Sequence, residues 1–281
     1  MSEYPFFQVD AFASKPFQGN QACIMPMDAF LADDKLQAIA AENNVAETAY
    51  IVPSENGRWK LRWFTPSTEV PLCGHATLAA AHTLWEHLDF EGPEIIFETM
   101  KSGELSVERT ETGYLMDFPA PEVTEIAVED EVVTALGARP VAAFSGPFYA
   151  AIFANPDEIA GLKPDLKALK ALGTSGQWER GNFGCLAPGG EEDVDVTSRF
   201  FAPGSGIDED PATGSWHCML AAVMSPRLDK NELKCFQAYP GRGAHIGTRL
   251  NEDRVLLAGQ AVTVIEGIFQ SKLEFVVMLQ L

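Results

Sequence analysis

The sequence has few basic residues and no long apolar run. It carries 20 lysines and arginines against 40 aspartates and glutamates, a formal net charge of −20 at pH 7. Nucleic acids and anionic membrane surfaces are bound through basic patches, so this balance argues against both as partners. No apolar stretch is long enough to cross a bilayer, and residues 1–15 lack the basic-then-apolar pattern of a secretory signal. We therefore expect a protein of the cytoplasm.

Cysteine is also scarce. The five cysteines are scattered and include no CxxC pair, which disfavours a disulfide framework and a structural zinc site. No GxGxxG or GxxxxGK[ST] pattern opens a helix, so neither a Rossmann nor a P-loop nucleotide site is expected. The sequence thus contains no metal or cofactor motif. Its hydrophobic content of 46% and its 281 residues are enough for two globular lobes, each with a core.

One stretch, residues 199–220 (RFFAPGSGIDEDPATGSWHCML), has the pattern of a strand, a Pro/Gly-rich loop and a helix. The first turn of a helix has N–H donors without internal partners, and the macrodipole adds partial positive charge there. A glycine such as Gly214 lets a ligand approach the backbone closely. The pattern therefore predicts an anion-binding helix N-terminus.

Residues 62–82 (RWFTPSTEVPLCGHATLAAAH) echo this stretch. When residues 62–66 are placed over 199–203, Cys73-Gly74-His75 falls near Thr213-Gly214-Ser215. Chance similarity is the alternative, but strand, proline loop, glycine turn and helix agree in order. The repeat predicts two similar halves, each with a helix N-terminus.

Strands dominate the rest of the pattern, with one well-marked helix in each half, which is typical of the α+β class. We expect lobes at residues 1–120 and 121–281, because prolines at 119 and 121 mark an exit from the first lobe. Whether the C-terminal strand crosses over to the first lobe is left open. A last strand is expected near residues 273–279.

Two further local expectations follow from the periodicity. Residues 31–44 have a helical pattern, with Asp33 as a plausible N-cap and Leu36, Ile39 and Ala40 on one apolar face. Residues 157–161 are expected to form only a short turn.

Glu47 and His75 are candidates for acid–base chemistry. Glu47 lies between the first helix and a strand, where a carboxylate is most often a solvated loop charge. Its alternative role is a general base, which a partly desolvated carboxylate can fill. His75 follows Gly74 at a helix start, so it is either a capping or packed histidine or a proton donor near neutral pH.

Asp210, Ser215 and Cys73 are weaker candidates. Asp210 precedes a helix, where an acidic charge favours the dipole; it could instead hold a substrate amine or orient a histidine. Ser215 fits a cap better than a nucleophile, because no GxSxG elbow surrounds it. Cys73 lies at a helix N-terminus, where thiols tend toward thiolate. A two-thiol racemase lacks its second thiol here, because Thr213 occupies the position that matches Cys73.

Several segments together resemble the phenazine-biosynthesis protein F family of PhzF-like isomerases. They are GNQACI, NNVAETAY, FTPSTEVPLCGHATLAAAH, FAPGSGIDEDPATGSW and GRGAHI, and the similarity extends from residue 7 to about residue 264. The resemblance implies a diaminopimelate-epimerase-like fold with two pseudo-symmetric lobes, each a mixed β-sheet curled around a central helix. It also implies an active site in the cleft between the lobes, no cofactor, and a homodimer.

The resemblance implies roles for individual residues. Glu47 matches the family's glutamate that moves a proton on a dihydro-hydroxyanthranilate, and His75, Asp210 and Ser215 match its other catalytic cleft residues. Gly74 and Gly214 fall at the two helix N-termini that hold a substrate anion, beside Cys73 and Thr213, which are counted with the binding residues.

The residues and the resemblance together favour a cofactor-independent isomerase of a small carboxylate-bearing metabolite. Two alternatives stay open: an epimerase or racemase of an amino-acid-like substrate, and a catalytically silent binder of small acids. Trp216 departs from the family pattern, in which this position is often small. It either lines the cleft or packs in the core, and aromatic burial favours the core.

Overall fold

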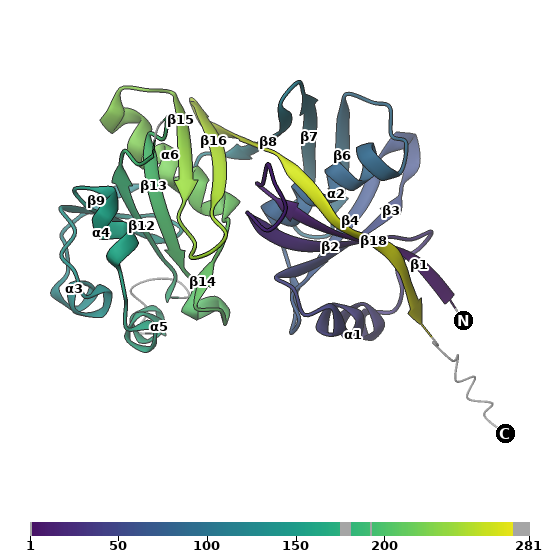
Figure 1. Ribbon diagram of the computed structural model, residues 1–281, viewed down its shortest axis with the longest axis horizontal. Helices are drawn as coiled ribbons and strands as arrows, with labels where there is room; N and C mark the ends of the chain where they lie inside the picture. The colour runs from purple at the N-terminus through teal and green to yellow at the C-terminus, as the bar shows by residue number, and fades with distance from the viewer. Residues whose placement is uncertain (1, 175–180, 192, 272–281) are drawn as a thin grey trace.

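The two halves of the chain lie side by side in the computed structural model, and each is a strand-rich layer curled around one long helix (Figure 1). The structure describes residues 2–174, 181–191 and 193–271. This is the mixed α+β architecture expected from the sequence. Within these ranges, no helix is both long and apolar enough to span a membrane.

The first half is built from eight strands and two helices. They are β1 (Ser2–Ala11), β2 (Asn20–Pro26), α1 (Asp33–Asn43), β3 (Glu47–Pro53), β4 (Trp59–Phe64), β5 (Glu69–Val70), α2 (Gly74–His87), β6 (Glu94–Thr99), β7 (Glu104–Thr110) and β8 (Gly113–Pro119). A single 3₁₀ turn, Glu55–Gly57, joins β3 to β4.

The rest of the described chain continues the same alternation. It contains β9 (Thr124–Ile126), α3 (Asp130–Leu136), β10 (Ala142–Ser145), β11 (Tyr149–Ile152), α4 (Pro156–Gly161), α5 (Leu166–Thr174), β12 (Phe183–Pro188), β13 (Val196–Phe201), β14 (Glu209–Asp210), α6 (Gly214–Leu228), β15 (Glu232–Gln237), β16 (Ala244–Asn251), β17 (Arg254–Gly259) and β18 (Ala261–Ser271).

Strand pairing repeats between the halves. The parallel pairs β2–β3 and β4–β6 of the first half recur as β11–β12 and β13–β15 in the second. Antiparallel pairing of β8 with β17 joins the halves. The last strand, β18, pairs with β1 of the first half, just as β9 pairs with β10 of the second. A lobe division at residue 120 falls between β8 and β9 and stays a prediction.

Matching side chains repeat as well. Arg62 on β4 forms a forked ion pair with Glu69, with Nε–Oε1 and Nη2–Oε2 distances of 2.7 and 2.9 Å. Arg199 on β13 holds Glu209 in the same way, at 2.7 Å for both contacts. Bidentate arginine–carboxylate pairs fix geometry tightly. Each ion pair therefore holds in place the turn that leads into a central helix.

The central helices are buried on nearly all sides. In α2, residues 75–85 are all buried, and α6 buries most of its length. A helix buried all round lies inside a core rather than on a surface. Trp216 of α6 is fully buried, and its ring fills the space above Gly184, where a Cβ would lie 2.2 Å from a ring atom. The expectation that Trp216 packs in the core is confirmed.

Two local expectations are wrong. The N-cap of α1 is Ala32, whose side chain cannot cap, and Asp33 is the first helical residue, where its carboxylate accepts from Arg62 at 2.9 Å. The turn expected at 157–161 is part of helix α4, which Asn155 caps by accepting from the Glu158 N–H. The signal was an N-cap asparagine followed by a proline at the first helical position. The strand expected at 273–279 lies outside the described residues.

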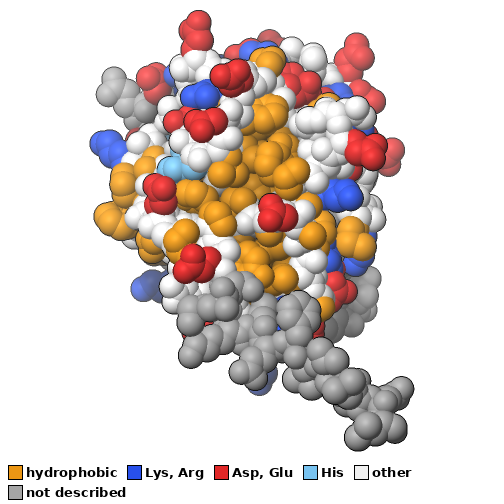
Figure 2. All heavy atoms as spheres, turned by 90° about the vertical axis from the view of Figure 1, so that its right-hand side faces the viewer, with side chains coloured by type: hydrophobic (Ala, Val, Ile, Leu, Met, Phe, Trp, Pro, Cys, Tyr) orange, Lys and Arg blue, Asp and Glu red, His pale blue; other side chains and the backbone are white. Residues whose placement is uncertain are grey.

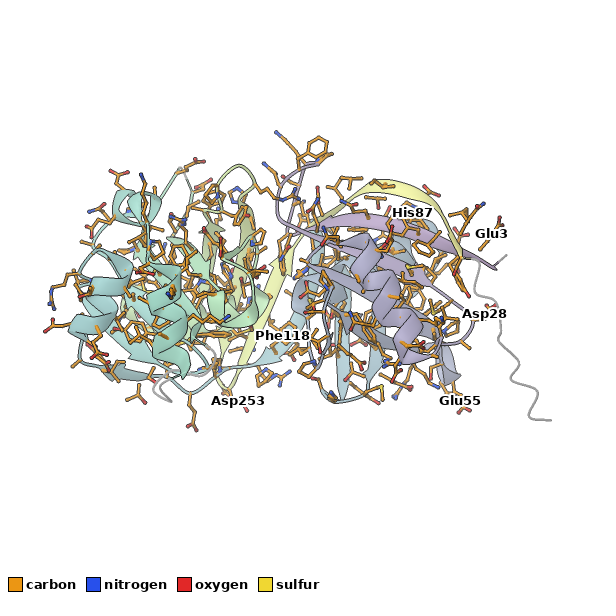
Figure 3. All side chains as sticks on the ribbon, turned by 90° about the horizontal axis from the view of Figure 1, so that it is seen from below. Glu3, Asp28, Glu55, His87, Phe118 and Asp253 are labelled. Atoms are coloured by element: carbon orange, nitrogen blue, oxygen red, sulfur yellow. The ribbon has the colours of Figure 1, made fainter. Side chains whose placement is uncertain are left out.

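Two histidines of α2 attach the crossing strand β18. One ring nitrogen of His82 lies 2.8 Å from the Tyr114 hydroxyl, and the other lies 2.9 Å from Thr263 Oγ1. His87 Nε2 lies 2.8 Å from the same threonine oxygen, and Figure 3 shows His87 beside this strand. Burial, with the nearby charges of His87 and Arg109, lowers the pKa of His82 to about 4.

The pKa of His82 predicts a loss of stability in mild acid. The unfolded histidine, with a pKa of 6.5, takes up its proton before the folded one, so stability is complete above pH 6.5 and falls as the pH drops toward 4. This residue alone should remove about 2 kcal/mol from the free energy of unfolding between pH 7.5 and pH 5. Urea denaturation of the wild type and His82→Gln at both pH values measures it.

The variant His245→Gln serves as the control, because His245 is exposed on β16. It should keep the full wild-type pH dependence. If His82→Gln loses as much stability as the wild type over the same interval, His82 is not the titrating group.

Candidate functional site

The N-termini of the two central helices face each other at the junction of the halves. Cys73 and Thr213 are the N-caps of α2 and α6, and both have extended backbones. Gly74 and Gly214 follow them, and a Cβ built on either glycine would lie 3.8 Å from the Cα of the other. Phe118 of β8, labelled at this junction in Figure 3, lies beside Gly74. The tertiary structure thus brings the backbone N–H groups at the starts of both helices, which lack partners within the helix, to one place.

Glu47 and His75 meet next to these helix ends. Glu47 is the first residue of β3, and its Oε2 lies 2.9 Å from His75 Nε2. The side chains are only 17% and 7% exposed, so the contact is largely desolvated. The buried Oε2 has no aligned hydrogen bond, so its contact with His75 is electrostatic. A partly desolvated carboxylate of this kind can accept a proton from a bound ligand.

The other edge of the His75 ring faces Cys73 and Asn20. His75 Nδ1 lies 3.5 Å from Cys73 Sγ and 3.3 Å from the Asn20 side-chain nitrogen. In a neutral ring, Asn20 donates to Nδ1 and the Nε2–H faces Glu47. This assignment of the proton follows from the contacts.

Burial sets the charge state of the sulfur and the imidazole. Burial and the Glu47 charge raise the pKa of Cys73, while His75 opposes them. The thiol is therefore protonated at neutral pH, and the thiolate expected from its place at a helix N-terminus is corrected. Burial disfavours the imidazolium of His75, but Cys73 and Glu47 together raise the pKa of His75 above its usual 6.5. Because the Cys73 thiol is neutral, the negative charge of Glu47 is what favours the protonated form of the His75 ring.

Asp210 reaches the same place from the second half. Its Oδ1 accepts from the Asn20 side-chain N–H at 2.8 Å, and its Oδ2 accepts from the Thr213 hydroxyl. Burial raises the pKa of Asp210 to about 6, against the opposing effects of His75 and the two hydrogen bonds. Gln237 fixes the backbone of this turn by accepting from the Thr213 N–H at 2.9 Å and donating to the Asp210 carbonyl at 2.5 Å.

Ser215 does not join this cluster. It lies exposed in the first turn of α6, and none of the hydrogen bonds among the described residues involves its side chain. The position that matches it in the repeat is His75, which is buried. A catalytic role for Ser215 stays a prediction.

Asn20 and Gln237 are site residues that the sequence did not single out. Asn20 is 1% exposed and contacts both halves, and its only sequence signal was its place in the segment GNQACI. Gln237 is fully buried at the end of β15 and had no signal, because its partners lie 24 and 27 residues earlier in the chain.

The cluster is only partly buried: Cys73 and His75 are buried, whereas Glu47, Gly74, Asp210 and Thr213 are half-buried. A cavity of about 470 Å³, lined among others by Tyr114, His245 and Gly259, shares none of its lining residues with the cluster. The donor atoms of Glu47, Cys73 and His75 lie within 4.8 Å of one another, the one such group among the described residues, and could hold a metal ion. The expectation that the site uses no metal stays a prediction.

Comparisons with known proteins agree with this architecture. The chain is 42% identical over 263 residues to an uncharacterized isomerase of Pseudomonas aeruginosa, covering 93% of this chain and 97% of the relative. A crystal structure of a phenazine biosynthesis protein of the PhzF family from Enterococcus faecalis superposes with a TM-score of 0.90 at 35% identity, covering 96% of this chain and all of that one.

More distant structures share the fold alone. A probable proline racemase from Agrobacterium radiobacter superposes with a TM-score of 0.61 at 10% identity, covering 96% of this chain and 93% of that one. The fold expected from the sequence is thereby confirmed. The sequence profile described as phenazine biosynthesis-like protein matches residues 9–267. The chain therefore belongs to the phenazine biosynthesis-like (PhzF) family.

Proposed function

We propose that the protein is a cofactor-independent isomerase that moves a proton within a small carboxylate-bearing molecule. The observation that carries this proposal is the buried contact of Glu47 with His75 beside the two facing helix N-termini. The names of relatives as isomerases support the reaction class. The phenazine substrate implied by the family name is not carried over.

Each part of the site has a role in this chemistry. Glu47 takes a proton from a substrate carbon with its carboxylate and returns it to another carbon. His75 orients Glu47 and stabilises its negative charge electrostatically while that charge changes. The N–H groups of the first turns, beginning at Gly74 and Gly214, hold the substrate carboxylate and the enolate-like charge that develops on proton removal.

The substrate class follows from the charge and size of the site. Two helix N-termini present partial positive charge in a desolvated place, which favours an anion even on a chain with a net charge of −20. The half-buried cluster between the two helix starts favours a small molecule, with Cys73 and Thr213 beside the bound anion. Burial raises the pKa of Asp210 to about 6, so a minor fraction of this carboxyl is protonated at neutral pH and can donate a hydrogen bond to a substrate oxygen.

A second candidate function is an epimerase of an amino-acid-like substrate. The observation that favours it is that Asp210 approaches the cluster from the second half, while Glu47 belongs to the first. Two acid–base groups on opposite sides of one carbon allow removal of a proton on one face and return on the other. The Cys73 thiol is another proton source near Glu47.

We further propose that the protein is a homodimer that associates through β18. Figure 2 views the end of the molecule where β1, β18 and α1 lie, and apolar side chains form a continuous band there. Ile265 and Ile268 of β18 are 48% and 59% exposed. Within the described residues β18 pairs only with β1, so its other edge is open. An open strand edge is self-complementary about a two-fold axis, which favours a second copy as the partner.

Deuterium uptake tests the isomerase. The wild type, in D2O with a panel of small unsaturated and amino carboxylic acids that includes a dihydro-hydroxyanthranilate, should label its substrate. Glu47→Gln should lower the rate of uptake by at least about 100-fold, because it removes the base while keeping the shape of the side chain. Mass spectrometry follows the label, and Glu42→Gln, at an exposed position of α1, should behave as wild type.

The products separate the candidates. A moved double bond identifies the isomerase, and labelling with inversion at one carbon identifies the epimerase. Uptake that survives in Glu47→Gln would remove Glu47 as the base. Thermal stabilisation by a panel member without any uptake would show a silent binder.

Sedimentation velocity tests the dimer. Ile268→Glu should convert the wild-type dimer to a monomer, because a buried unpaired carboxylate opposes association at an apolar interface. Val141→Glu, at an apolar residue of the second half that is 66% exposed, should remain dimeric. A wild-type monomer, or a dimer that survives Ile268→Glu, would contradict an interface at β18.

A further inference from the structure

Besides the β8–β17 pairing, one turn of the first half connects the two halves. This turn, residues 12–19, connects β1 to β2 and ends just before Asn20. Arg242, in the turn between β15 and β16, donates from Nη2 to Asp10 Oδ1 and to the Gln18 carbonyl, both at 2.7 Å. Its Nε donates to the Gly19 carbonyl at 2.9 Å. One guanidinium thus binds a side chain and two backbone carbonyls across the junction.

Backbone contacts and burial strengthen this connection. The Gly19 N–H donates to the Gly243 carbonyl at 2.6 Å, directly beside Arg242. Asp10 is 1% exposed, and its second oxygen accepts from the Phe17 N–H at 2.7 Å, so its charge is fully engaged. Removing one partner of a buried ion pair leaves the other charge uncompensated. The loss of this buried ion pair should therefore destabilise the junction of the halves more than the loss of an exposed surface ion pair would.

The turn is also packed tightly against the end of β1. Gly19 has a φ of +60°, and a Cβ at this position would lie 2.0 Å from the Ala11 carbonyl oxygen. Only glycine fits there without a shift of the backbone. A displacement of Gly19 is therefore transmitted to the next residue, Asn20.

Asn20 connects the displacement of this turn to the candidate site. Its side-chain nitrogen lies 3.3 Å from His75 Nδ1, 2.8 Å from Asp210 Oδ1 and 3.3 Å from the Ala212 carbonyl. It thus lies against the Nδ1 edge of the His75 ring. The position of Asn20 therefore decides both the orientation of the histidine and the approach of Asp210.

We infer that Arg242 is a positioning residue that latches the second half to the Asn20 turn and keeps the candidate site assembled, with Cys73 buried. Arg242 does not contact the acid–base groups and acts through Asn20. When the latch is open, the halves part at this turn, His75 loses the Asn20 side chain beside it, and small molecules reach Cys73. The inference rests on the proposed function for its meaning, since the site that it assembles is the proposed proton-transfer site.

The alkylation rate of Cys73 measures whether the Arg242 contacts hold the site together, and it needs no catalytic turnover. The Cys73 side chain is buried against His75 and is 8% exposed, so alkylation by iodoacetamide requires the site to open. Cys185 of β12 is fully buried in the core of the second half and reacts only if that half unfolds. Peptide mass spectrometry of the full chain gives the rate at each cysteine separately. A failed deuterium experiment leaves this readout unaffected.

The test compares three variants with the wild type at neutral pH, well below the melting temperature. Arg242→Ala should speed the alkylation of Cys73 by at least about 10-fold with Cys185 unchanged, because local opening precedes global unfolding. Arg242→Lys should give an intermediate rate, since an ammonium can pair with Asp10 but lacks the planar fork. Arg249→Ala, which removes an exposed ion pair with Glu232 on the neighbouring strand, should match the wild type.

Three results would overturn the inference. They are an unchanged Cys73 rate in Arg242→Ala, a Cys73 rate that rises only in step with that of Cys185, and an Arg249→Ala variant that opens the site as much as Arg242→Ala. If Arg242→Ala does not fold, Arg242→Lys decides by the same ratio of the two cysteine rates.

Discussion

The two central helices of this protein begin next to each other, so that their positive N-terminal poles face one another. The first turns of α2 and α6 meet at Gly74 and Gly214, and like partial charges at this distance repel. The structure compensates with acidic groups from both halves, since Glu47 and Asp210 lie beside the helix ends. In the function that we propose, an anionic ligand relieves the repulsion that the fold itself creates.

Burial gives these acidic groups their chemical character. It raises the pKa of Asp210 to about 6 and keeps Cys73 a thiol, while Glu47 holds a proton on His75. Carboxylates elsewhere on the chain supply most of the net charge of −20, and water and salt screen exposed charges beyond about 10 Å. A strongly acidic surface is therefore compatible with the anion-binding site that we propose.

The repeat explains both the symmetry of the scaffold and the asymmetry of the site. Arg62 with Glu69 and Arg199 with Glu209 clasp equivalent turns, so each half presents its helix in the same way. The residues after the glycines then differ: His75 is buried and Ser215 is exposed. The acid–base pair lies mainly in the first half, and the second half contributes Asp210 and the Thr213 turn.

The sequence by itself determined the features that depend on neighbouring residues. The two strand–loop–helix units, the starts of α2 and α6, the α+β class and the candidates Glu47, His75 and Asp210 could be predicted, because propensity, turn chemistry and motif spacing are local. Only the tertiary structure decided that β18 joins the first half, that Asn20 reaches Asp210 across 190 residues, and that Arg242 reaches Asp10 across 232. It also decided the exposure of Ser215 and the protonation of Cys73. These features depend on which distant segments exclude water from one another, and no local pattern in a single chain encodes that.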